Sequence, residues 1–388
     1  MRYARRKLED RIAKAARGFG AVVLTGPRRA GKTYLLQHLL PKADYVLLED
    51  PETLARVRAD PRGFLAERRP PVILDEIQNA PELFNYVRAL LDRTPRRTGQ
   101  WFLTGSQEAS LMAGVTESLA GRAAIFQLLP LSLAESGKVD LFSGGFPEVL
   151  ARPRQREVWF SSYLQSYLER DVRAVTNVRD LATFRRFLGL VAARHGQVLN
   201  RSDLAGPLGV SVPTVSEWLS ILEVTGQVLI VPPYFENFGK RLIKAPKIYW
   251  VDSGLACYLL GIRTRAELGR SPFRGALFEG LVAAEIAKAQ LNAGGRKEIY
   301  FFRDRPGLEI DFLIPHAGSL WLVEAKAGGT VFPNDARAIQ SLMAGRKGAK
   351  PARGLVVHQE TRHSSPTSVL VPGVQALTLR QFVALLNA

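Results

Sequence analysis

The stretch AVVLTGPRRAGKTYLLQHLL, residues 21–40, decides the fold of the first part of the chain. Its opening residues, AVVLT (21–25), form a short apolar run that is typical of a buried strand. Residues 26–33, GPRRAGKT, match the pattern G-x-x-x-x-G-K-[ST] in full, and the residues after them have helical spacing. A strand, a glycine-rich loop and a helix in this order predict a phosphate-binding loop.

The residue types of this loop suit a bound phosphate. Gly26 and Gly31 allow a tight turn, so that backbone N–H groups converge on an anion at the start of a helix. Lys32 is expected to reach the β and γ phosphates of ATP, and Thr33 is expected to place its hydroxyl on Mg²⁺. The residues predicted to bind the nucleotide are Gly26, Pro27, Arg28, Arg29, Ala30, Gly31, Lys32 and Thr33.

Further short apolar runs follow, and helical patterns separate them. Each run is too short for a helix and is bounded by glycine, proline or charged residues. Strands that alternate with helices predict an α/β domain with a parallel sheet and helices on both of its faces, over about residues 1–135. The predicted strands are YVLLE (45–49), VILDE (72–76), WFLTG (101–105) and AAIFQL (123–128).

An acidic pair ends the strand in PVILDEIQ, residues 71–78. Asp75 and Glu76 come at the carboxyl end of that strand, which is where ligand crevices form in open α/β sheets. Asp75 is expected to hold Mg²⁺, and Glu76 is expected to orient and deprotonate the attacking water. A solvated acidic cap is the alternative, which the complete phosphate loop disfavours.

Three more residues are candidates for the catalytic machinery. The strand that ends in LTGSQ (103–107) is expected to lie between the strands that carry the loop and the acidic pair. Thr104 or Ser106 would then lie near the γ phosphate, although ordinary turn chemistry also explains a Thr-Gly-Ser sequence. Arg122 is a candidate arginine finger or sensor, acting in its own chain or in a neighbour, and a plain surface arginine is the alternative.

Composition limits the class of protein. With 388 residues the chain has room for two or three domains at roughly 100–200 residues each. Hydrophobic residues make up 46% and charged residues 23%, which excludes a wholly disordered or fibrous chain. The single cysteine, Cys257, excludes an internal disulfide and metal sites built from several thiolates, and it favours a cytoplasmic location. No apolar run is long enough to predict a membrane span.

The formal net charge of +17 favours a polyanionic partner such as nucleic acid. An arginine-rich surface that reflects genomic base composition is the alternative.

Residues 136–255 have a different pattern. Helical periodicity up to Leu222 is followed by a strand-like run at 227–234, and helices followed by a short hairpin predict a winged helix-turn-helix. Its second helix, 212–222, has no Lys, Arg, Asn or Gln and contains Glu217, which disfavours base-specific reading in the major groove. A structural or protein-contact role and sequence-tolerant contact with phosphates both stay open. The basic residues near the expected wing are Lys240, Arg241, Lys244 and Lys247.

Residues 256–388 return to mixed α/β patterns and carry a second group of carboxylates. Glu279 lies in a predicted helix, Asp311 in the strand EIDFLI, and Glu324 and Lys326 in the strand LWLVEAKA. Adjacent strands would bring these four side chains together, and their carboxylates are predicted to bind a second Mg²⁺ or a Mn²⁺. A solvated strand face is one alternative. Another is that Lys326 pairs with a carboxylate and the domain only binds a partner.

Several motifs spread through the chain resemble one family. The sequence resembles the prokaryotic AAA-domain ATPases that carry a C-terminal domain of unknown function. The resemblance implies ATP binding and hydrolysis on a P-loop fold with an additional strand, and it implies that Arg122 acts on the nucleotide. The D…E-x-K pattern of Asp311, Glu324 and Lys326 is similar to the core of restriction-endonuclease-like folds. The matching motifs are GPRRAGKT (26–33), LDEIQ (74–78), LTGS (103–106), LAGR…LLPLSLAE (119–135), GGFPEV (144–149), YLERDV (167–172) and KIYWVDSGL (247–255).

The sequence therefore predicts a P-loop ATPase that acts on or near nucleic acid, with an endonuclease-like C-terminal domain. The alternative is an ATP-dependent switch or partner-binding regulator whose C-terminal domain is inert. A transcription regulator is disfavoured by the acidic recognition helix. A homo-oligomer and a protein partner are both compatible with the sequence.

Overall fold

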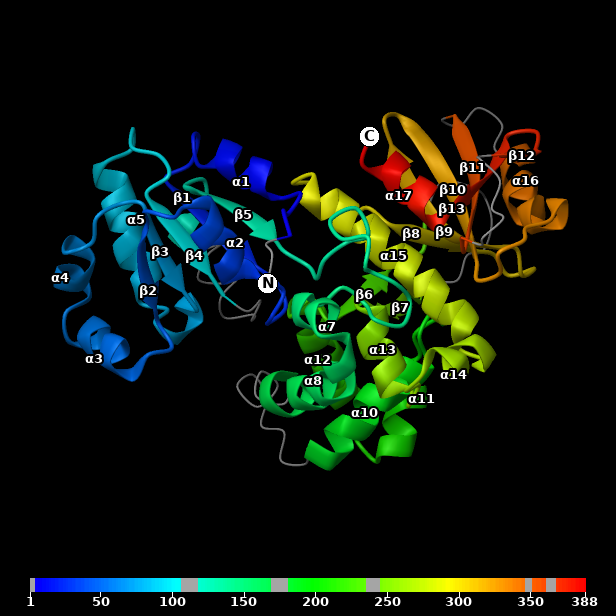
Figure 1. Cartoon of the computed structure of the whole chain (residues 1–388), viewed down its shortest axis with the longest axis horizontal. Coiled ribbons are helices and arrows are strands. Elements are labelled where there is room, and N and C mark those ends of the chain that lie inside the picture. Colours follow the sequence, from blue (N-terminus) through cyan, green and yellow to red (C-terminus); the bar gives the residue numbers. More distant parts are fainter. Residues whose placement is uncertain (1–3, 106–117, 169–180, 235–244, 346–350, 361–367) are drawn as a thin grey trace.

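The computed structural model describes residues 4–105, 118–168, 181–234, 245–345, 351–360 and 368–388. Within these residues the strands form sheets of five, two and six strands. Figure 1 shows the five-stranded and six-stranded sheets at opposite ends of the molecule, with the helices from the middle of the chain below and between them.

The five-stranded sheet confirms the predicted parallel α/β architecture of the N-terminal region. Its strands are all parallel, in the order β2-β3-β4-β1-β5. Strand β1 continues into the phosphate loop, and strand β3 ends in Asp75. Strand β4 lies between these two strands. The bounds are β1 (Ala21–Thr25), β2 (Asp44–Leu47), β3 (Val72–Asp75), β4 (Trp101–Thr104) and β5 (Ala123–Gln127).

Helices cover both faces of this sheet. Val22 and Leu24 of β1 belong to one buried cluster, whereas Ala21 and Val23 belong to another. Successive residues of a strand point to opposite faces, so the two clusters are the two sides of the sheet. The helices on the first side are α1 (Glu9–Ala15) and α2 (Lys32–Leu39), and those on the second are α3 (Pro51–Ala59), α4 (Pro61–Ala66) and α5 (Leu83–Arg93).

The middle of the chain contains helices where the sequence predicts them, followed by an antiparallel pair of strands. The second helix of the predicted pair begins at an N-cap, Ser211, whose side chain accepts a hydrogen bond from the backbone of Thr214. The assignment of these elements to a winged helix stays a prediction. The elements are α7 (Pro147–Ala151), α8 (Arg156–Tyr163), α10 (Leu181–Ala193), α11 (Arg201–Leu208), α12 (Val212–Val224), the antiparallel β6 (Val228–Val231) and β7 (Lys247–Trp250), α13 (Ser253–Leu259) and α14 (Arg265–Arg270).

The C-terminal region is a mixed six-stranded sheet with helices packed against it. The strand order is β12-β13-β11-β10-β9-β8, and β9 runs antiparallel to β10. Phe312 pairs with Val323, so Asp311 and Glu324 come next to each other across these two strands. The elements are α15 (Arg274–Asn292), β8 (Tyr300–Arg303), β9 (Glu309–His316), β10 (Ser319–Lys326), α16 (Arg337–Ala344), β11 (Ala352–His358), β12 (Ser368–Val371), β13 (Val374–Thr378) and α17 (Leu379–Leu386).

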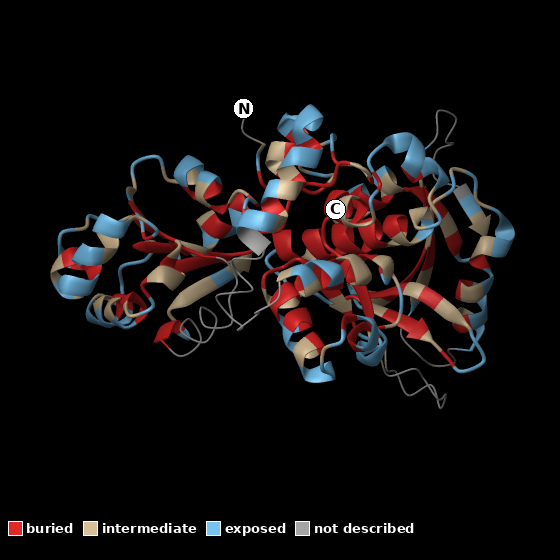
Figure 2. Cartoon of the chain, turned by 90° about the horizontal axis from the view of Figure 1, so that it is seen from below, coloured by how far each residue is buried: buried red, intermediate tan, exposed pale blue. Residues whose placement is uncertain are grey.

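The middle and C-terminal regions share one continuous core, in which α15 is the most buried helix (Figure 2). Gly280 allows the buried ring of His195 to pack directly on α15, because a Cβ at this position would lie 1.8 Å from His195 Nε2. The C-terminal end of α15 reaches the N-terminal region, so this helix connects all three parts of the molecule (Figure 1). Among the residues described, no helix is both long and apolar enough to cross a membrane.

Candidate functional site

A cavity of about 560 Å³ lies at the carboxyl edge of the N-terminal sheet. The phosphate loop and the acidic pair at the end of β3 line it. The chain's first described residues, Leu131 and the start of α7 line it as well. The lining residues are Ala4, Arg6, Arg28, Arg29, Ala30, Gly31, Lys32, Thr33, Tyr34, Leu47, Glu49, Asp75, Glu76, Leu131, Pro147 and Glu148.

The loop has the geometry of an anion cradle. Gly26 has a φ of 135°, and a Cβ there would lie 2.1 Å from the carbonyl oxygen of Leu128, so only glycine fits. Gly31 has a φ of 97° and immediately precedes α2. The buried Lys32 ammonium donates hydrogen bonds to the carbonyl oxygens of Gly26 (2.9 Å) and Pro27 (3.1 Å). The loop thus keeps the Lys32 ammonium at the wall of the cavity, where it can meet a phosphate.

Asp75 lies directly beside the loop. The hydroxyl of Thr33 lies 3.0 and 2.9 Å from the two carboxylate oxygens of Asp75. Tyr45 donates a hydrogen bond of 2.8 Å to the same carboxylate, and the fully buried Thr104 donates another. Burial, followed by the bond to Asp75, raises the pKa of the Tyr45 hydroxyl well above its usual value. The hydroxyl and carboxylate oxygens of Thr33 and Asp75 are hard ligands that fit Mg²⁺.

Glu76 occupies a backbone conformation that non-glycine residues seldom adopt. Its φ of 58° and ψ of 48° lie in the left-handed region, which costs about 1–3 kcal/mol and is found mostly at functional sites. Its backbone N–H donates to the hydroxyl of Thr104 (3.3 Å), and its carboxylate accepts from Gln78 and lies 3.7 Å from Nη1 of Arg28. These contacts hold the Glu76 carboxylate at the wall of the cavity.

Of the remaining predicted catalytic residues, Arg122 is described by the structure, and it does not lie in this site. Arg122 precedes β5, at the edge of the sheet opposite to the phosphate loop, and a five-residue strand such as β5 spans about 16 Å. Its guanidinium forms a bidentate ion pair with Asp92, in which Nε lies 2.5 Å from Oδ1 and Nη2 lies 3.2 Å from Oδ2. Action on the nucleotide of its own chain therefore has no geometric support, and an arginine-finger role would require a neighbouring copy. Ser106 lies outside the described residues.

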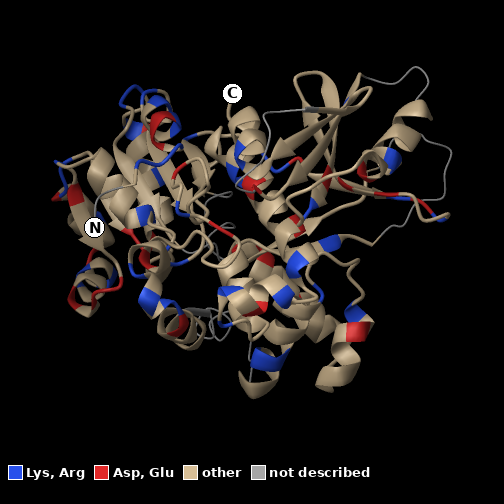
Figure 3. Ribbon diagram, turned by 45° about the vertical axis from the view of Figure 1, so that its right-hand side comes forward, with Lys and Arg blue, Asp and Glu red and all other residues tan. Residues whose placement is uncertain are grey.

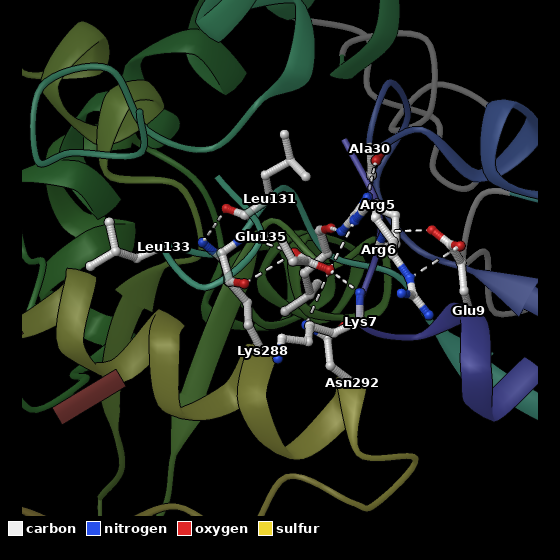
Figure 4. Close-up of polar contacts among 12 residues, drawn as sticks. Arg5, Arg6, Lys7, Glu9, Ala30, Leu131, Leu133, Glu135, Lys288 and Asn292 are labelled. Carbon is white, nitrogen blue, oxygen red and sulfur yellow. Dashed lines mark hydrogen bonds and ion pairs between the residues drawn. The ribbon is translucent and has the colours of Figure 1, made fainter. Parts of the chain in front are cut away.

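Arg6 and Glu135 form a buried ion pair behind the loop that the sequence did not single out (Figure 4). Arg6 Nε lies 3.0 Å from Glu135 Oε1, and its Nη1 donates to the carbonyl oxygen of Ala30 at 2.8 Å. Glu135 also accepts from the backbone of Lys7 and from the side chain of Asn292. Burial works to raise the pKa of Glu135, but the Arg6 charge and the hydrogen bonds from Ser132, Arg6 and Lys7 outweigh it and lower that pKa.

The same face of α15 makes further contacts with the segment that follows β5. Glu285 accepts a hydrogen bond of 2.8 Å from the backbone of Leu133, and Lys288 donates one of 3.1 Å to the carbonyl oxygen of Leu131. Glu285 and Lys288 are themselves paired at 3.0 Å and buried (Figure 4 shows Lys288 beside Leu131). The nucleotide cavity is thus attached to the C-terminal region through buried charges.

The second predicted cluster converges, but around a lysine. Asp311 accepts a hydrogen bond from the backbone next to Glu324, and Lys326 Nζ lies 3.3 Å from Glu324. Lys247 Nζ lies 2.9 Å from Glu279 and 3.8 Å from Asp311. Among the described residues there is no group of three or more His, Cys, Asp or Glu side chains arranged to hold a metal ion. The prediction of a second Mg²⁺ or Mn²⁺ therefore has no support here.

Two further side chains complete this cluster. Glu309 lies 2.6 Å from Lys247 Nζ, and the hydroxyl of Tyr249 donates to Glu279 at 2.5 Å. Burial works to lower the pKa of Lys247, but the surrounding carboxylates outweigh it and raise that pKa. Burial, followed by the charge of Asp311, raises the pKa of Glu279.

Contact with nucleic acid phosphates, which the sequence left open for Lys247, does not fit the structure. Its side chain is 3% exposed and is surrounded by carboxylates of the C-terminal region. Lys240, Arg241 and Lys244 lie outside the described residues. A lysine at the start of an apolar strand, KIYW, was the available signal for a buried cation.

The family model that matches the N-terminal region agrees with the site. Residues 19–137 match the model of an AAA domain, and residues 139–266 and 274–380 match two models described as domains of unknown function, DUF8612 and DUF4143. The chain is similar to the solved structure of a Walker-type ATPase, paby2304 of Pyrococcus abyssi, at 16% identity and a TM-score of 0.43, over 65% of this chain and 94% of that one.

Two curated proteins are similar over almost the whole chain. They are Uncharacterized protein Rv2008c of Mycobacterium tuberculosis and Uncharacterized protein Mb2031c of Mycobacterium bovis. Each is 32% identical over 383 residues, which are 96% of this chain and 85% of the relative. The chain therefore belongs to the same family as these mycobacterial proteins, and it is a P-loop ATPase with an AAA domain followed by two domains of unknown function.

Proposed function

We propose that the chain binds ATP with Mg²⁺ in the cavity at the edge of the N-terminal sheet and hydrolyses it there. The observation that carries this proposal is that Lys32, Thr33, Asp75 and Glu76 all line one cavity. Release of phosphate from ATP by the purified chain, and its loss in Lys32→Ala, is the test.

Each of these residues has a separate role in the proposed reaction. Lys32 leaves its carbonyl acceptors and binds the β and γ phosphates, while the backbone of the loop surrounds them. Thr33 and Asp75 hold Mg²⁺, which neutralises phosphate charge when bound. Glu76 accepts the proton of the attacking water, and Thr104 positions both carboxylates because it bonds to Asp75 and to the backbone of Glu76.

Nucleic acid is the second candidate partner, and the net charge of +17 favours it. Figure 3 shows Lys and Arg on many elements from one end of the molecule to the other, interspersed with Asp and Glu rather than collected on one element. With the charges spread in this way, the support for nucleic acid is the overall positive charge, which would act on the phosphate backbone without base reading.

Binding of nucleic acid is expected to be tolerant of sequence and to weaken steeply with salt. Each phosphate that is neutralised contributes about −0.9 to the slope of log K against log salt concentration on B-DNA. Fluorescence anisotropy with unrelated DNA and RNA oligonucleotides at several salt concentrations measures this slope. A flat salt response, or no binding at low salt, would argue against a nucleic-acid partner and would favour the ATP-dependent switch.

At the C-terminal cluster we infer that the Lys247 ammonium takes the place that a metal ion would have. Clustered carboxylates repel one another unless a cation or a proton intervenes, and Lys247 contacts Glu279, Glu309 and Asp311. Cleavage of phosphodiesters at this cluster would require a metal in place of that lysine. The inference favours a C-terminal domain that binds a partner.

Wild-type protein is therefore expected to show no nicking of plasmid DNA with Mn²⁺ at this cluster. Lys247→Met is expected to gain a thermal stabilisation by Mn²⁺ in the absence of nucleotide, since a metal at 100 times its Kd stabilises by about 2.7 kcal/mol. Lys288→Met, which removes another buried lysine, is the matched control and is expected to gain none. Nicking by the wild type that disappears in Asp311→Ala would show that the cluster binds metal and cleaves.

A further inference from the structure

Glu148, in the first turn of α7, lines the cavity next to the phosphate loop. Its Oε1 lies 3.5 Å from Nη1 of Arg29, a residue of the loop. Its other oxygen, Oε2, is shielded from solvent and has no hydrogen-bond partner among the residues described. Carboxylate oxygens that are shielded from water normally have a donor, so this one points to a donor that only a ligand supplies.

The segment before Glu148 is fixed in place by close backbone packing. Gly145 donates its N–H to Asp252 at 2.7 Å and accepts from the N–H of Leu131 at 2.8 Å. A Cβ on Gly145 would lie 2.2 Å from the carbonyl oxygen of Leu131, and one on Gly144 would lie 2.1 Å from Asp252. These contacts require glycine at both positions, and they hold the start of α7 at the wall of the cavity.

We propose that Glu148 accepts hydrogen bonds from the ribose hydroxyls of the bound nucleotide. The proposal rests on ATP binding in this cavity. Bound phosphates give Arg29 a new anionic partner, so Arg29 leaves Glu148 and exposes its carboxylate beside the part of the nucleotide next to the phosphates, which is the sugar. Two neighbouring hydroxyls are the donors that a carboxylate accepts with both of its oxygens.

The rest of this wall suits the base. Ala4, Leu131 and Pro147 line the same side of the cavity as Glu148, and apolar surface with a few placed polar groups is the usual lining of a nucleoside site. Glu148 lies beyond residues 19–137, the part of the chain that matches the AAA domain. Recognition of the sugar thus belongs to the region that follows the ATPase domain.

The experiment compares the binding of ATP and 2′,3′-dideoxy-ATP by calorimetric titration. Wild type is expected to bind the dideoxy nucleotide about tenfold more weakly, because a hydrogen bond to a charged group contributes a factor of at least this size. Glu148→Ala is expected to bind ATP about tenfold more weakly than wild type and the dideoxy nucleotide equally well. Glu148→Gln keeps the shape of the side chain and one acceptor oxygen, so its affinity for ATP is expected to lie between those of wild type and Glu148→Ala. Glu157→Ala, which removes an exposed glutamate of α8, is the matched control.

Equal weakening of ATP and dideoxy-ATP by Glu148→Ala would overturn the proposal, because Glu148 would then act only through Arg29. Unchanged binding of both nucleotides would overturn it as well. If both nucleotides are weakened equally, Arg29→Ala and the double variant of Arg29→Ala with Glu148→Ala would lose as much nucleotide affinity as Glu148→Ala alone. Failure of the ATP site itself is a different result, in which Lys32→Ala binds ATP as tightly as wild type does.

Discussion

Lys32→Ala is expected to lose ATP binding, whereas Glu76→Gln is expected to bind ATP and fail to hydrolyse it. Lys32 supplies the charge that meets the phosphates in the ground state, and its ammonium already lies in the loop beside Gly26 and Pro27. Glu76 acts only when a water molecule gives up its proton, and a general base contributes about 10²–10⁴-fold to the rate. Nucleotide titration measures the first loss, and phosphate release under saturating ATP measures the second.

Two exposed residues of the same region provide controls. Lys42→Ala removes a positive charge and Glu52→Gln a negative one, both at exposed positions that do not line the cavity. Both variants are expected to bind and hydrolyse ATP as wild type does. Hydrolysis by Glu76→Gln at the wild-type rate would show that another group activates the water. Binding by Lys32→Ala at the wild-type affinity would show that the nucleotide site lies elsewhere.

Glu135→Ala is expected to lower the free energy of unfolding by about 3–5 kcal/mol, because it leaves the Arg6 charge buried without its partner. The backbone N–H groups of Lys7 and Ser132 also lose their acceptor. Urea denaturation followed by tryptophan fluorescence measures the change. The loss of stability is expected to affect the ATPase domain, because Arg6 also donates a hydrogen bond to the carbonyl oxygen of Ala30 in the phosphate loop.

An exposed ion pair is the matched control. Glu360 and Arg380 are 2.9 Å apart and more than half exposed, so Glu360→Ala is expected to change stability by less than about 1 kcal/mol. The double variant Arg6→Met with Glu135→Ala is expected to be more stable than Glu135→Ala alone, because no uncompensated charge remains. A loss in Glu135→Ala no greater than that in Glu360→Ala would show that the pair contributes little.

The phosphate-binding part of the site could be predicted from the sequence because its chemistry is local. Eight consecutive residues determine the loop, and Asp75 and Glu76 are neighbours at the end of a single strand, Asp75 as its last residue and Glu76 directly after it. Strand length, turn residues and apolar spacing also determine the parallel sheet, since each strand has to bury both of its faces between helices. The helix pair of the middle region and the strand β6 followed in the same way from local patterns.

The positions of Arg122, Lys247 and Glu148 were decided only by tertiary structure. Arg122 comes just before β5, so the direction of β5 in the sheet decides the edge at which Arg122 lies. A short motif does not contain that information. Lys247 and Asp311 are 64 residues apart in sequence, yet they meet because β7 packs against the C-terminal sheet. The four predicted C-terminal side chains do come together, but the ammonium that pairs with Glu279 and Asp311 belongs to Lys247, from the middle region.

The sequence by itself determined the chemistry of this protein wherever the functional atoms belong to one strand and its following turn. The tertiary structure alone decided which charges meet across regions, such as Arg6 with Glu135 and Glu148 with Arg29. The physical reason is the range of the interactions. Backbone conformation and apolar periodicity act over a few residues, whereas burial places a charge beside whichever partner the packing of distant elements brings to it.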